Sequence, residues 1–151
     1  MRMAPVGLFF WRLGGRASLP QAFRLGTELA ALTHGNPTGA LAGGVFAVLI
    51  LAVIDGMSLK EAVAEAKVLL RQERSHGETL HALEKAEMLA SSGLPHDKAI
   101  AALGLGWIAE EALAISIYCA LVALDFRQGV VLAVNHDGDS DSTGAMTGNL
   151  L

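Results

Sequence analysis

Cysteine is almost absent from this chain, because Cys119 is the only one among 151 residues. A single cysteine excludes a disulfide framework and a zinc site built from thiolates. Cys119 lies in an apolar run, so we expect a buried thiol. A chain without disulfides suits a reducing compartment, and we expect a cytoplasmic protein.

Charged residues are also scarce, at 17% of the chain, and the formal net charge is −4. The arginines are scattered and form no basic stripe, which argues against a nucleic-acid partner held through its phosphates. Hydrophobic residues make up 52% of the chain, which argues against disorder. A chain of 151 residues is long enough for one domain with a hydrophobic core.

No signal peptide is recognisable, since Arg12 interrupts the short apolar run near the start and no small-residue cleavage pattern follows. Residues 38–54 carry no charge, but 17 residues are at the lower edge of what a bilayer requires. Asn36 and Pro37 begin this segment as a helix, Asp55 ends it, and no basic residue anchors either end. We therefore predict the core helix of a soluble domain and no membrane partner; a membrane-spanning helix is the alternative.

Strand patterns are absent, because the β-branched residues fall in helical runs and do not alternate with polar ones. Helix starts follow one another with short gaps, among them the capping-box pairs Ser58–Glu61 and Ser75–Glu78. We predict an all-α fold, a compact orthogonal helical domain of about seven or eight helices. The expected helices begin near Ser18, Asn36, Ser58, Ser75, Asp97, Trp107, Asp125 and Gly144.

The stretch NHDGDSDSTGAM, residues 135–146, holds three aspartates at alternate positions, Asp137, Asp139 and Asp141. Helical residues two apart do not face each other, so these carboxylates act together only in a loop or at the start of a helix. Carboxylates with the hydroxyl of Ser142 or Thr143 suit Mg²⁺ or Mn²⁺ better than zinc. Aspartate, glycine and serine are also ordinary turn and cap residues, so spacing alone leaves both interpretations open.

A calcium-binding EF-hand loop does not fit the same stretch. The three aspartates match its first, third and fifth positions. The sixth position requires glycine and holds Ser142, and the twelfth requires glutamate and holds Gly148.

Five segments, in order, resemble the ADP-ribosylglycohydrolase family, which includes the dinitrogenase reductase-activating glycohydrolases. They span the whole chain and read MRMAPVGLF, THGNPTGALAGGVFAVLI, GWIAEEALAISIYCAL, DFRQGVVLAVNHDGDSDS, and GDSDST followed by GAMTGNLL. The resemblance implies hydrolysis of the glycosidic bond between ADP-ribose and a protein side chain or related acceptor. The expected substrates are ADP-ribosylated proteins or small molecules that contain ADP-ribose.

The resemblance also implies a two-metal site occupied by Mg²⁺ or Mn²⁺. By motif, Asp139 and Asp141 correspond to metal ligands, and Ser142 supplies a hydroxyl where the family has threonine. His34 matches the histidine of a Thr-His loop that lies near the ADP-ribose. Asp137 stands where glycine is common, and we interpret it as a turn residue.

Two adjacent glutamates, Glu110 and Glu111, match the region of the family's helix glutamate. They support the site in one interpretation. In the other, which we favour, each is a buried or edge glutamate paired with an arginine. The glycine pairs 39/43 and 144/148 are one helical turn apart and are expected to allow close helix contact.

The chain lacks other parts of the family pattern, because no adjacent Asp-Asp pair and no glycine-rich phosphate loop before Met1 are found. The catalytic acidic residue is therefore unknown, and we expect a single domain, 1–151, without the family's N-terminal half and the end of its last helix. Such a chain is expected to be inactive alone and to associate through exposed apolar surface. The alternative is a non-catalytic helical module that binds metal, ADP-ribose or a complementary polypeptide.

Overall fold

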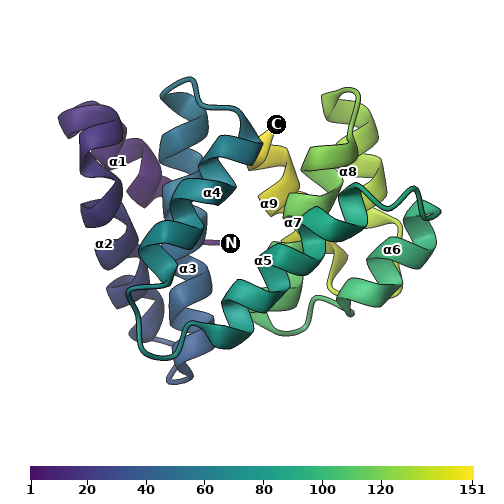
Figure 1. The fold of residues 1–151 in the computed structure, drawn as a ribbon, viewed down its shortest axis with the longest axis horizontal. Helices are drawn as coiled ribbons and strands as arrows, with labels where there is room; N and C mark the ends of the chain where they lie inside the picture. The colour runs from purple at the N-terminus through teal and green to yellow at the C-terminus, as the bar shows by residue number, and fades with distance from the viewer. The chain divides into compact units, whose positions relative to one another are not determined.

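The computed structural model describes all residues from Met1 to Leu151 and contains nine α-helices, one short 3₁₀-helix and no strand (Figure 1). The chain divides into two compact units, Met1–Leu80 and His81–Leu151, and each is described by itself. The all-α class is confirmed. The single orthogonal domain stays a prediction.

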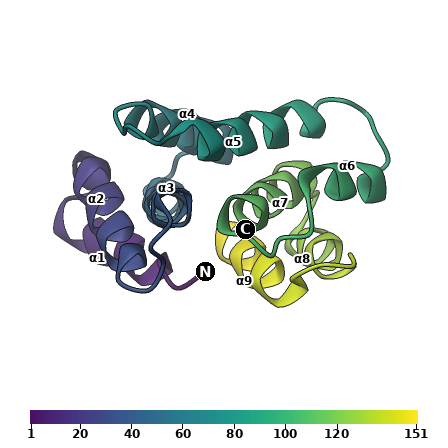
Figure 2. The same cartoon turned by 90° about the horizontal axis from the view of Figure 1, so that it is seen from below.

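The first unit is built around α3 (Pro37–Ile54). It also contains α1 (Ala4–Gly14), the 3₁₀-helix Gly15–Ser18, α2 (Leu19–Ala31), α4 (Leu59–Leu70) and the beginning of α5 (Gly77–Ala90). Asn36 caps α3 by accepting a hydrogen bond from the Thr38 amide at 3.0 Å, and Pro37 suits the first helical position. Figure 2 looks nearly along α3, with α1 and α2 on one side of it and α4 above.

Helix α3 is apolar on every side. It is long and apolar enough to cross a membrane by length and composition, but 72% of it is buried inside the structure. The three neighbouring helices α1, α2 and α4 cover it. A helix that is hydrophobic all round needs such cover in water, and this burial favours the predicted core helix.

Three glycines let α2 and α3 approach closely. A Cβ atom at Gly43 would lie 2.7 Å from the Ala30 Cβ, and one at Gly26 would lie 3.0 Å from the Gly43 carbonyl oxygen. At Gly44 it would lie 2.7 Å from the Phe23 carbonyl oxygen. The predicted role in helix contact is therefore confirmed for Gly43, whereas Gly39, with no neighbour nearer than 3.6 Å, has room for a side chain.

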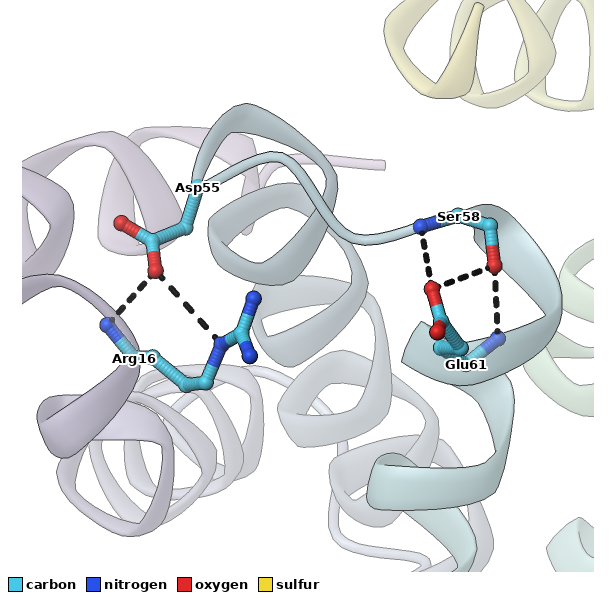
Figure 3. A network of polar contacts seen from close by, with 4 residues as sticks. All are labelled: Arg16, Asp55, Ser58 and Glu61. Atoms are coloured by element: carbon cyan, nitrogen blue, oxygen red, sulfur yellow. Dashed lines mark hydrogen bonds and ion pairs between the residues drawn. The ribbon is translucent and has the colours of Figure 1, made fainter.

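Local polar contacts fix the connections of the first unit (Figure 3). Asp55, just after α3, accepts a hydrogen bond from the Arg16 amide at 3.2 Å and pairs with the Arg16 Nε at 3.7 Å. Ser58 and Glu61 form the predicted capping box of α4, in which the Glu61 Oε2 accepts from the Ser58 amide at 2.9 Å. The Ser58 hydroxyl holds the pKa of Glu61 below its ordinary value.

The second predicted capping box is wrong. Helix α5 begins at Gly77, so Ser75 is not its cap residue. Glu78 accepts a hydrogen bond from the Thr38 hydroxyl at 2.5 Å instead of bonding back to Ser75. Ser75 and Glu78 have the residue types of a capping box, but the Glu78 carboxylate bonds to Thr38, which is distant in the sequence.

The second unit is built around α7 (Ala109–Val122), which α6 (His96–Leu103), α8 (Phe126–Val134) and α9 (Ser140–Leu150) contact (Figures 1 and 2). Residues 112–120 of α7 are all buried. Burial raises the pKa of the Cys119 thiol to about 12, so the predicted buried cysteine is confirmed. The buried Ser116 hydroxyl donates to the Ala112 carbonyl at 2.7 Å and to the Thr143 carbonyl of α9 at 3.3 Å.

Helix α1 is the element that the sequence did not predict. Its cap residue Met3 makes no side-chain capping bond, so the usual start signal is missing. Pro5 in the first turn was the remaining clue. Gly7 and Val6 are buried on its inner face, and a Cβ at Gly7 would lie 2.7 Å from the Ala47 carbonyl oxygen of α3.

Candidate functional site

The aspartate turn, residues 135–139, joins α8 to α9. Asp139 is the N-cap residue of α9, and Asp141 and Ser142 lie in its first turn. This places the carboxylates at the start of a helix, one of the two positions expected for them, although the helix begins at Ser140 and not near Gly144. Asp137 is exposed in the turn, where its role as a turn residue stays a prediction.

The carboxylate of Asp139 lies near Asp141 and Ser142. Asp139 makes no capping hydrogen bond of normal geometry. The Asp141 side chain, within hydrogen-bonding reach, is the main cause that holds the pKa of Asp139 below its ordinary value. The Ser142 hydroxyl and amide act in the same direction, and burial opposes them. Asp139 is therefore ionised at neutral pH beside a second acidic group.

His136, which the sequence did not single out, and Thr143, one of the two hydroxyl candidates, fix the shape of the turn. The Gly138 amide donates to the His136 Nδ1 at 3.1 Å, so the other ring nitrogen, Nε2, carries the proton and lies 2.9 Å from the Thr143 hydroxyl. Thr143 is fully buried, and its hydroxyl donates toward the Ala133 carbonyl at 2.6 Å. The Thr143 hydroxyl is thus engaged inside the turn, which leaves Ser142 as the better candidate for a ligand.

A second turn, Gly104–Gly106, packs directly against the aspartate turn, and we call it the Gly-Leu-Gly turn. The Asp139 amide donates to the Leu105 carbonyl oxygen at 2.8 Å. A Cβ atom at Gly138 would overlap that carbonyl oxygen, so only glycine permits this approach. The two backbones are therefore fixed to each other at the residue that carries the first candidate ligand.

Glu111 bonds to the Gly-Leu-Gly turn and not to an arginine, so the arginine pairing favoured from the sequence is wrong for this residue. The Glu111 Oε2 accepts from the Leu105 amide at 3.0 Å and from the Gly106 amide at 3.1 Å. The sequence did not predict this contact. The separation between Glu111 and these loop residues matches no helix or capping motif.

The candidate substrate residue His34 lies in the first unit, just after α2. It is exposed, and its Nδ1 lies 2.9 Å from the Thr33 hydroxyl. The Arg2 guanidinium donates to the same hydroxyl at 3.2 Å. These contacts orient the ring while its other nitrogen has no partner within the protein.

The oxygen donors of Asp139, Asp141 and Ser142 fit part of the coordination shell of a hard divalent cation. The Asp139 carboxylate, whose pKa is held below its ordinary value, makes no capping hydrogen bond of normal geometry and is available for such a role. No group of three histidine, cysteine, aspartate or glutamate side chains that could hold a metal ion gathers in the structure. The fit is therefore partial, and a complete site requires ligands beyond these three residues.

Comparison with known proteins gives one match. A family model described as ADP-ribosylglycohydrolase matches residues 1–151. No curated protein and no solved structure matches the chain.

Proposed function

Because the chain belongs to the ADP-ribosylglycohydrolase family, we propose that its aspartate turn serves metal-dependent hydrolysis of a glycosidic bond to ADP-ribose. The acceptor is a protein side chain or a related group. Asp139, Asp141 and Ser142 contribute oxygen ligands to a two-metal site for Mg²⁺ or Mn²⁺. Family membership supports a hydrolase of this general type and ADP-ribosylated substrates.

The observation that carries the metal assignment is the pairing of two carboxyl groups at the start of α9. The Asp141 side chain lies within hydrogen-bonding reach of Asp139 and is the main cause that holds the pKa of Asp139 below its ordinary value. Two carboxylates so close repel each other when both are ionised. A divalent cation would offset that repulsion, and the Ser142 hydroxyl would add a neutral oxygen donor.

The roles of the residues follow from their chemistry. Metal ions at such a site would supply a fixed water and charge stabilisation at the reacting carbon. Asp139 and Asp141 would supply carboxylate oxygens there. Ser142 would supply a hydroxyl oxygen at the position where the family has threonine. His34 is proposed to contact the ADP-ribose, since its exposed ring nitrogen can bond a hydroxyl or a phosphate oxygen.

We further propose that this chain alone does not hydrolyse its substrate. Two carboxylates and one hydroxyl are fewer ligands than two hexacoordinate cations need, and no adjacent Asp-Asp pair supplies the rest. The partial donor set also favours the second candidate function, a non-catalytic module that binds metal, ADP-ribose or a complementary polypeptide. In either case we place the protein in the cytoplasm.

The metal assignment is tested by titrating the chain with Mn²⁺ and following paramagnetic broadening of backbone amide NMR signals. We expect the amides of residues 138–143 to broaden first. The double variant Asp139→Asn, Asp141→Asn keeps the shape of both side chains and should lose this selective broadening. The control Asp137→Ala should behave as wild type, since Asp137 is exposed in the same turn.

Equal broadening in the double variant and the wild type would show that the metal assignment is wrong. The inactivity is tested separately by incubating the purified chain and Mn²⁺ with an ADP-ribosylated protein. We expect no release of ADP-ribose, and measurable turnover by this chain would contradict that part of the proposal.

A further inference from the structure

Glu111 is connected to the candidate metal ligands by an unbroken series of hydrogen bonds. We propose that Glu111 is a positioning residue, which sets the place of Asp139 by holding the Gly-Leu-Gly turn. This inference rests on the proposed metal role of Asp139 and Asp141. Glu111 itself binds no metal in this proposal, and it acts only through the backbone of residues 105 and 106.

The first link is between the Glu111 carboxylate and two backbone amides. Glu111 is the third residue of α7, a position from which glutamate usually bonds back to the amide of the N-cap residue. Here it reaches further back, to the amides of Leu105 at 3.0 Å and Gly106 at 3.1 Å. The N-terminal end of the helix also favours a negative charge at this place.

The second link is the shape of the Gly-Leu-Gly turn. Gly104 and Gly106 have φ angles of 125° and 77°, which side chains other than glycine rarely adopt. A Cβ atom at Gly104 would overlap the Glu111 carboxylate. The turn is therefore folded around this side chain, and both of its inward amides point at one oxygen atom.

The third link is Leu105, which joins Glu111 to the aspartate turn. Its amide donates to Glu111, and its carbonyl oxygen accepts the Asp139 amide at 2.8 Å. A Cβ atom at Gly106 would lie only 3.7 Å from the Asp139 Cβ, so the next residue also borders the candidate ligand. Any rotation of the Leu105 peptide moves the N-cap backbone from which the Asp139 carboxylate projects.

The test compares four variants of the full chain. Glu111→Ala removes the acceptor, and Glu111→Asp keeps the charge but shortens the side chain by one methylene. Glu111→Gln keeps the length and one oxygen acceptor without the charge. Glu110→Ala is the matched control, because the neighbouring carboxylate lies in the same helical turn and does not bond the Gly-Leu-Gly turn.

Two measurements are made on each variant. Without metal, hydrogen exchange of the Leu105, Gly106 and Asp139 amides reports the hydrogen bonds themselves. With Mn²⁺, the concentration that half-broadens the signals of residues 138–143 reports affinity. We expect Glu111→Ala and Glu111→Asp to lose the protection and to weaken Mn²⁺ affinity about 10- to 100-fold, as loss of a group that orients a ligand does. Glu111→Gln and Glu110→Ala should remain near wild type.

Unchanged protection and Mn²⁺ affinity in Glu111→Asp would overturn the inference, and this variant decides the matter if Glu111→Ala does not fold. A wild-type chain that binds no Mn²⁺ would refute the proposed metal function instead. Hydrogen exchange without metal then still tests the role of Glu111. Faster exchange of the Asp139 amide in Glu111→Asp supports the positioning role, and unchanged exchange refutes it.

Discussion

Substitution of Gly44 by alanine tests whether glycine sets the distance between α2 and α3. The new Cβ atom would lie 2.7 Å from the Phe23 carbonyl oxygen and would overlap the Thr27 hydroxyl. The hydroxyl donates to that same carbonyl at 2.9 Å, so moving it away breaks a hydrogen bond. The carbonyl belongs to the backbone of α2 and moves only if the two helices separate.

The expected magnitude is the difference of two opposing effects. Overpacking of a close contact costs about 1–3 kcal/mol. Replacing glycine by alanine inside a helix returns about 0.5–1 kcal/mol. We therefore expect Gly44→Ala to lower the free energy of unfolding of the first unit by about 1–2 kcal/mol. Gly39→Ala is the matched control on the same helix. With no neighbour nearer than 3.6 Å, it should raise that free energy by up to about 1 kcal/mol.

Tryptophan fluorescence provides the assay. The chain has two tryptophans, Trp11 in α1 and Trp107 outside any helix, and the second is 68% exposed. In a Trp107→Phe background, urea unfolding is followed through Trp11, which lies in the first unit. If Gly44→Ala stabilised this unit as much as Gly39→Ala, the close approach of α2 and α3 would be refuted.

Two further predictions follow from pKa values. Burial raises the pKa of Cys119 to about 12, so a disulfide reagent at pH 8 should label this thiol only after the second unit unfolds, and rapid labelling of the native chain would contradict its burial. Because the Ser58 hydroxyl lowers the pKa of Glu61, the capping box stabilises the fold fully above the ordinary glutamate pKa and loses this effect as the pH falls through the lowered one. Ser58→Ala should raise the Glu61 pKa toward its ordinary value in a ¹³C-carboxyl NMR titration, and an unchanged value would rule out the hydroxyl as its cause.

Helices were predictable where their start signals are local. Asn36, Ser58 and Asp125 each cap a helix through their own side chain, and each helix begins where the sequence indicated. Helix α1 was missed because Met3 supplies no such cap. At Ser75 the local signal was present but the predicted capping box is wrong. The Glu78 carboxylate binds Thr38, a partner that no local pattern reveals.

In the candidate site, too, local features were predictable from the sequence and contacts between distant segments were not. The spacing of Asp139 and Asp141 limited them to a loop or the start of a helix, and the structure places them at the start of α9. The contact of Leu105 with Asp139 joins segments on opposite sides of α7 and α8 in the chain, so no periodicity predicts it. Glu111 was misjudged because sequence reasoning weighed side-chain partners and not backbone amides.

Asp139 illustrates how a fold leaves a carboxylate available for binding. An N-cap aspartate with a well-formed capping bond contributes about 1 kcal/mol, and Asp139 makes no capping hydrogen bond of normal geometry. Other groups steady the start of α9 in its place. The Thr143 hydroxyl lies 3.1 Å from the Asp139 carbonyl oxygen, and the Leu105 carbonyl accepts the Asp139 amide. Since backbone contacts fix the residue, its carboxylate is left near Asp141 and Ser142, the other two proposed ligands.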